Sequence, residues 1–228
     1  GIAGYQDLMA RLRELPEVKA VTPLIETHGL ARMPYPAGPR KEVGTVQVWG
    51  IDPESFTQVS DLGRVLYWKP PADRAARAEM AEDDPRLRLP EGMLEQGLRM
   101  RTADGRPAML TGMHVSILNK RQPDGSYRRT NADWWLPEHD ITLTLVPVSD
   151  RGTLSQNSRV FPVANEVMTG VFQIDRNRIY IPIDQAQQML RLDEAPIVDT
   201  SAEPNEDGSL PILGTSPARA THARCPCC

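Results

Sequence analysis

Residues 167–192 read VMTGVFQIDRNRIYIPIDQAQQMLRL, and this stretch decides most of the predicted fold. Residues 178–182 form a short apolar run that predicts a strand. Its isoleucines share one face, because side chains alternate along a strand: Ile179, Ile181 and Ile183. Asp184 and Gln187 have the spacing of a capping box, which marks the start of a helix. The expected core face of that helix is Ala186, Met189 and Leu190.

The composition of the 228-residue chain agrees with short elements separated by many breaks. Its 21 prolines are spread along the whole length, and proline interrupts helices because it lacks a backbone N–H. Long helical bundles and coiled coils are therefore excluded. With 40% hydrophobic and 25% charged residues, the chain can bury a core. No apolar run reaches the 18 residues expected of a membrane-spanning helix.

Periodicity predicts the other elements. Apolar residues at helical spacing indicate helices at 4–15 and 91–100. Alternating residues indicate strands at 18–26, 43–51, 109–118, 141–148 and 160–173. The sequence Gln-Pro-Asp-Gly-Ser within 119–129 is a turn signal and predicts the tip of an exposed hairpin over 118–135. Residues 69–91 are densely charged without apolar periodicity, and we interpret them as a solvated helix-and-loop insertion.

The charge and the cysteines bound the partners and the location. A net charge of −4 provides no basic field, so we expect no nucleic-acid partner. All cysteines lie in the last four residues, which leaves the redox compartment open: Cys225, Cys227 and Cys228. The chain begins at Gly1 without a segment that resembles a signal peptide. We interpret it as processed or as an excised piece of a longer protein.

Sequence motifs of catalysis and cofactor binding are absent. There is no P-loop, Rossmann glycine pattern, nucleophile elbow or His-Glu-x-x-His pair. The histidines lack the short spacings of zinc ligands: His28, His114, His139 and His222. We therefore predict a non-enzyme without catalytic residues, cofactor or metal. The alternative is a secreted hydrolase-like enzyme whose site converges from scattered residues such as His114, Asp140 and Asp175.

Two further clusters have a functional and a plain interpretation. The acidic run at 82–84 could bind a cation, but Arg86 and Arg88 nearby favour a solvated face. The terminal Cys-Pro-Cys-Cys could bind a soft metal, yet no second cysteine pair completes a four-ligand set. Exposed thiols in a tail are the plainer interpretation.

The predicted partner-binding residues belong to the hairpin and its return. The turn projects the tip from the body, and the arginines can meet carboxylates of a partner. The paired tryptophans could anchor a partner, because buried tryptophan tends to dominate interfaces, or they could plug the base of the hairpin as core residues. The predicted set is Pro123, Asp124, Tyr127, Arg128, Arg129, Trp134 and Trp135.

Three stretches together resemble a known family. They are LPEVKAVTPL at 15–24 followed by VQVWGIDPESF at 46–56, LPEGMLEQGLRM at 89–100, and the block at 167–192. In this order they are similar to the MacB-like periplasmic core domain of ABC transporter permeases, of the lipoprotein-releasing or MacB type. The third block carries the family's most specific pattern on Thr169, Gly170, Phe172, Asp175, Ile181, Pro182, Ile183, Ala186 and Gln187.

The resemblance implies a fold and a division of the chain. The fold would be α+β, a two-part α/β extracytoplasmic domain: a small mixed sheet with short helices plus a β-rich insertion subdomain. Residues 1–66 would form the first part and 67–178 the insertion subdomain, with 69–91 as its charged insertion. Residues 179–198 would return as strand and helix, and 199–228 would be loop or tail. The family's closing strand and helix are not recognisable after about residue 217.

The resemblance also implies a function. The domain would lie between two transmembrane helices of a permease, on the periplasmic face of the cytoplasmic membrane. It would couple ATP-driven membrane motion to the handling of a lipoprotein or another export substrate, without chemistry of its own. Its partners would be the rest of the permease with its transmembrane helices, the cytoplasmic ATPase indirectly, and a periplasmic adaptor, chaperone or lipoprotein. An unrelated secreted interaction domain is a third interpretation.

Overall fold

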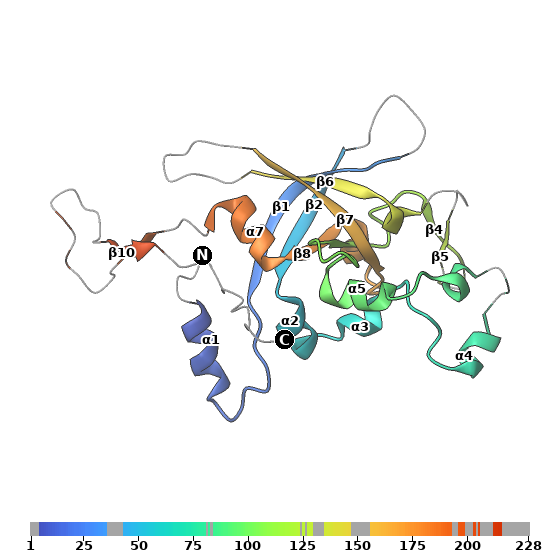
Figure 1. Cartoon of the computed structure of the whole chain (residues 1–228), viewed down its shortest axis with the longest axis horizontal. Coiled ribbons are helices and arrows are strands. Elements are labelled where there is room, and N and C mark those ends of the chain that lie inside the picture. Colours follow the sequence, from blue (N-terminus) through green and yellow to red (C-terminus); the bar gives the residue numbers. More distant parts are fainter. Residues whose placement is uncertain are drawn as a thin grey trace.

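The fold is a closed β-barrel with short helices packed around it (Figure 1). The computed structural model describes residues 5–35, 43–80, 82, 84–123, 125, 127–129, 135–146, 156–192, 196–198, 203, 205 and 212–215. The barrel strands are β1 (Leu24–Arg32), β2 (Val43–Ile51), β3 (Met109–Gly112), β6 (Asp140–Leu145), β7 (Asn157–Val167) and β8 (Arg178–Pro182). Their order around the barrel is β1-β2-β8-β3-β7-β6, and the β1–β6 pairing closes it.

The barrel mixes antiparallel and parallel pairs. β1 pairs with β2 and β6, β6 with β7, and β3 with β8, all antiparallel. β2 runs parallel to β8, with Val48 opposite Ile179, and β3 runs parallel to β7. Parallel strands cannot be joined by a tight turn, and the chain between β3 and β7 accordingly contains the barrel strand β6.

The closed barrel overturns the predicted fold class. A two-part domain with a small mixed sheet and a β-rich insertion subdomain is wrong, because one sheet of six strands closes on itself. The predicted mixture of helices and strands is present. Closure depends on the pairing of Gly29 with Leu145 and of its neighbours, between strands far apart in the chain. The proposed division at residues 66, 178 and 198 stays a prediction.

Alternating apolar residues fill the barrel interior. β6 buries every second residue, and β2, β7 and β8 supply the opposing side chains. The main buried residues are Val46, Val48, Ile141, Leu143, Leu145, Phe161, Val163, Ile179 and Ile181. Helix α7 (Ile183–Leu190) adds Ala186 and Met189 to this core. A Cβ at Gly50 would lie 2.5 Å from the Ala186 Cβ, so glycine lets α7 pack closely on β2.

A second apolar layer joins the barrel to three short helices. These are α2 (Pro53–Val59), α3 (Leu62–Val65) and α5 (Met93–Arg99), which lie together beside the barrel (Figure 1). Asp52 caps α2 by accepting a hydrogen bond from the Ser55 N–H at 3.2 Å. The layer buries Ile51, Leu62, Leu66, Met100, Leu110, Val167 and Tyr180. It fixes α5 against the outer side of β7.

The remaining elements lie outside these two layers. They are α1 (Tyr5–Arg13), α4 (Arg74–Ala78), η1 (Pro85–Arg88), β4 (Asn119–Arg121), β5 (Tyr127–Arg129), η2 (Leu136–Glu138), α6 (Phe172–Asn177), β9 (Pro196–Val198) and β10 (Ile212–Thr215). β4 and β5 pair as the predicted hairpin, and β9 pairs with β10. Over the described ranges, no helix combines the length and apolar character needed to cross a membrane.

Candidate functional site

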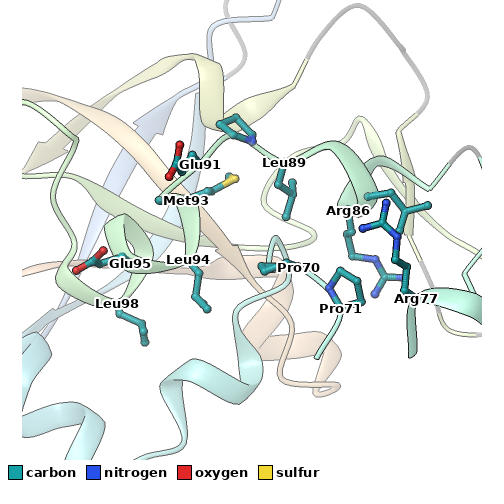
Figure 2. A pocket seen from close by; sticks show the side chains of 13 residues that line it. Pro70, Pro71, Arg77, Arg86, Leu89, Glu91, Met93, Leu94, Glu95 and Leu98 are labelled. Atoms are coloured by element: carbon teal, nitrogen blue, oxygen red, sulfur yellow. The ribbon is translucent and has the colours of Figure 1, made fainter. Parts of the chain in front are cut away.

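A hollow of about 440 Å³ lies beside α5 (Figure 2). We call it the groove. Its walls are mainly apolar and are formed by Pro70, Pro71, Leu87, Leu89, Pro90, Gly92, Met93, Leu94 and Leu98. Four charged residues complete it: Arg77, Arg86, Glu91 and Glu95. The volume lies in the range of about 300–1,000 Å³ that is usual for ligand-binding clefts.

The walls of the groove are held by the core behind them. Pro70 and Pro71 follow Lys69 and the fully buried Trp68, so this wall leaves the core from a fixed point. Met93, at the start of α5, is only 6% exposed. Gly92 precedes it with a φ of 75°, a left-handed conformation that glycine adopts without strain. Because proline also fixes φ, the groove is largely preformed.

The two ends of the groove carry opposite charges. Arg77 and Arg86 lie at one end, and Glu91 and Glu95 lie at the other, with Pro70 between them (Figure 2). Glu95 is paired with Arg99 along the helix at 2.7 Å. Arg77 and Glu91 make no ion pair with any residue that the structure describes.

Asp84 fixes Arg86 at the rim of the groove. Its carboxylate accepts hydrogen bonds from the Arg86 backbone N–H at 2.8 Å and from Arg86 Nη2 at 2.7 Å. Burial alone would raise the pKa of Asp84, but these hydrogen bonds lower it below its ordinary value. The side-chain hydrogen bond to Asp84 raises the pKa of Arg86. The guanidinium of Arg86 also lies 5.3 Å from the centre of the Tyr67 ring.

A smaller hollow of about 250 Å³ adjoins the groove. It shares Leu89 and Pro90 with the groove and is otherwise lined by Asp84, Pro85, Arg88, Trp135 and Glu138. Residues 84–90 therefore line both hollows. The two hollows therefore lie next to each other, with Leu89 and Pro90 in the walls of both.

An aromatic cluster backs the groove. Trp68 is fully buried and meets Tyr67 and Trp135 edge to face, with ring centres 4.8 and 5.2 Å apart. Tyr127 meets Tyr67 in the same way at 5.7 Å. Each such pair contributes about 0.5–1.5 kcal/mol beyond the area it buries. Leu89 and Met93 pack on this cluster, so the groove has a rigid floor.

A buried polar centre fixes the cluster to the barrel. The carboxylate of Glu166, on β7, is fully buried and accepts hydrogen bonds from Trp68 Nε1 and Asn119 Nδ2, both at 2.7 Å. The neighbouring Asn165 accepts from the Trp68 N–H at 3.1 Å and donates to the Trp68 carbonyl at 2.8 Å. The segment that leads into the groove is thereby attached to the barrel at several points.

His114 joins the hairpin to the loop that follows β7. Its Nε2 lies 2.6 Å from the Tyr127 hydroxyl, and its ring lies 5.0 Å from Phe172 between ring centres. Burial lowers the pKa of His114; Arg121 and Arg176 also lower it, whereas Asp175 raises it. Burial raises the pKa of the Tyr127 hydroxyl.

Two of the scattered residues of the enzyme alternative, His114 and Asp175, lie close together. The carboxylate of Asp175 accepts hydrogen bonds from the Thr169 N–H at 2.8 Å, the Thr169 hydroxyl at 2.7 Å and the Gly170 N–H at 3.1 Å. The backbone carbonyl of Asp175 accepts the His114 N–H at 2.8 Å. Asp140 instead lies exposed at the start of β6. The role that the structure gives Asp175 is to close the loop at 169–175.

The predicted partner-binding residues have different environments. Tyr127 and Trp135 are each 8% exposed and face the aromatic cluster. Pro123 and Arg128 are exposed on the hairpin. Asp124, Trp134 and the side chain of Arg129 lie outside the described residues. Partner binding by this set stays a prediction.

The other sequence candidates are placed as follows. His28 is exposed on β1, and His139 is half-buried after η2. Glu82 is exposed, Asp84 contacts Arg86, and Asp83, His222 and the cysteines lie outside the described residues. Where the structure describes the chain, no group of three or more His, Cys, Asp or Glu side chains is placed to hold a metal ion.

Sequence reasoning missed the groove. The interpretation of 69–91 as a solvated insertion followed its dense charge and gave the prolines between the charges no role in a binding surface. The available signal was a set of rigid or apolar residues within this polar segment. They line the hollow: Pro70, Pro71, Leu87, Leu89 and Pro90.

Comparison with known proteins adds no relative. No family model matches the chain, and no curated protein matches it.

Proposed function

We propose that this chain is a non-catalytic binding module that receives a partner in the groove. The observation that carries the proposal is the groove itself: a preformed apolar hollow with two charges on its rim, Arg77 and Glu91, that form no ion pair with the residues the structure describes. Exposed apolar hollows of this kind are typical of binding sites. The rigid floor formed by Trp68 and its neighbours reduces the entropy that binding would cost.

We propose that the module works in an ABC transporter permease, on the periplasmic face of the cytoplasmic membrane. The resemblance of three sequence stretches to the MacB-like core domain supports this setting. The third stretch has a physical role here, because Thr169 and Gly170 hold the carboxylate of Asp175 and so shape the loop before β8. In this setting the partners are the permease's transmembrane part, the ATPase indirectly, and an adaptor, chaperone or lipoprotein.

The permease setting is tested by the natural reading frame around this chain. It predicts apolar segments of about 20 residues on both sides and an ATPase with a P-loop encoded nearby. A reading frame without such segments would favour the secreted interaction domain instead.

The binding role is tested in the natural full-length protein in its host. The groove variant R77E/E91K reverses both rim charges, and R74E/E79K is a matched control. Arg74 and Glu79 are exposed in or beside the same helix, α4, and do not line the groove. Surface changes of this kind alter the free energy of unfolding by about 0.5 kcal/mol or less, so both purified variants should stay folded.

We expect the groove variant to restore function less well than the control in a strain that lacks the natural protein, because reversed rim charges weaken the binding of a partner. The control should restore it. If both variants restore function equally, the groove is not the binding site.

A further inference from the structure

The shape of the groove restricts what it can hold. The groove and the smaller hollow share Leu89 and Pro90, so the two lie next to each other, and the smaller one is lined by Trp135 and Glu138. A compact ligand would fill only one of the two hollows. An extended chain fits both, because its successive side chains can enter one after another.

The charges of the groove further restrict which occupants it can hold. Figure 2 shows the arginines and the glutamates separated by the apolar walls around Pro70. Arg77 and Glu91 have no ion pair with the described residues, so each is available to an opposite charge on an occupant. An occupant therefore matches the groove if it carries an acidic group on one side of an apolar centre and a basic group on the other side. A fatty acyl chain with an anionic head would match only the arginine end.

We propose that the groove binds an extended polypeptide segment with leucine-like side chains at its centre. An acidic side chain of the segment faces Arg77 and Arg86, and a basic side chain faces Glu91 and Glu95. The proposal rests on the proposed function of the groove and adds the chemistry of its partner. Charge pairs at a solvated rim contribute little affinity each, so the apolar centre supplies most of the binding and the charges set the direction of the segment.

The test uses synthetic peptides titrated against the full 228-residue chain by calorimetry. Two peptides carry Asp and Lys on opposite sides of a Leu-Pro-Leu centre, one in each chain direction. A third peptide replaces the charges by Asn and Gln, and a fourth replaces the leucines by Ser. Micelles of a single-chain anionic lipid test the acyl-chain alternative.

We expect one direction of the charged peptide to bind about two- to five-fold more tightly than the neutral peptide at low salt. The difference should shrink at high salt, because screening weakens exposed charge pairs. The serine peptide should bind weakly or not at all. In R77E/E91K the preferred direction should reverse, whereas R74E/E79K should keep the wild-type preference.

Three results would overturn the inference. They are no peptide binding at millimolar concentration, equal binding of the charged and neutral peptides with no reversal in R77E/E91K, and binding of the lipid alone. None of these results decides the proposed function. That function is tested separately in the host, where the comparison of R77E/E91K with its control examines the groove without assuming which partner it binds.

Discussion

The Nε2 atom of His114 lies 2.6 Å from the phenolic oxygen of Tyr127, and this contact links the hairpin to the loop behind β3. The backbone of Tyr127 also forms two hydrogen bonds with the Tyr67 hydroxyl. Its carbonyl accepts from this hydroxyl at 3.3 Å, and its N–H donates to it at 3.2 Å. The hairpin, the aromatic cluster and the groove floor are therefore one connected unit.

The pKa of His114 predicts a pH dependence of stability. Because burial lowers this pKa in the folded protein, the unfolded chain binds a proton more readily between the folded value and the ordinary value of about 6.5. The free energy of unfolding should therefore rise with pH through this window and level off above it. Urea unfolding at a series of pH values measures the slope.

The variant H114Q should flatten this dependence, because glutamine does not titrate. H28Q is the matched control, since His28 is exposed on β1, and it should keep the wild-type slope. A slope that H114Q leaves unchanged would show that another group causes it.

Gly112 lies in tight contact with the backbone of Asp175, so a larger residue at this position should destabilise the protein. A Cβ at this position would fall on the backbone carbonyl of Asp175, the same carbonyl that accepts the His114 N–H. G112A should lower the free energy of unfolding by about 1–3 kcal/mol, as forced overpacking does. At Gly44 a Cβ would meet nothing within 4 Å, so G44A should be close to neutral. Equal effects of the two changes in chemical denaturation would contradict this contact.

The buried carboxylate of Glu166 should contribute strongly to the stability of the protein, because buried donors would lose an acceptor without it. E166A would remove the acceptor of Trp68 Nε1 and one of the acceptors of Asn119 Nδ2, which also donates to the Met113 carbonyl at 2.9 Å. Each buried donor without a partner costs about 1–3 kcal/mol, so the variant should be strongly destabilised. E54A, at an exposed position of α2, is the control. Thermal unfolding followed by tryptophan fluorescence measures both, and a wild-type midpoint for E166A would refute the role of this centre.

Local patterns predicted the elements that alternation or turn chemistry specifies. The strand at 43–51 is confirmed as β2, the strand at 178–182 as β8, and the turn before Tyr127 joins a β4–β5 hairpin. The strand predicted at 109–118 ends at Gly112, because the chain turns there to place His114 against Asp175. The strand predicted at 18–26 is shifted to 24–32.

The barrel and the groove could not be predicted from local patterns. Closure requires β1 to pair with β6 and β2 to lie parallel to β8, and these contacts leave no signal at Gly29 or Val48 themselves. The groove combines residues around Pro70 with residues around Met93, which only the fold brings together. Charge at 69–91 indicated a solvated surface, and the prolines among those charges were the missed signal.

The groove predicts a direct contact with a polypeptide partner in the living host. Pro71 lies in the wall of the groove and is replaced by a photoreactive phenylalanine derivative for this test. The control carries the same derivative in place of the exposed Asp104. The measurement is the cross-linked adduct in the natural full-length protein. We predict a discrete polypeptide adduct from position 71 that is absent from position 104, is weakened in R77E/E91K and keeps its strength in R74E/E79K. An adduct of equal strength in R77E/E91K and R74E/E79K, or no adduct from position 71, would contradict the account.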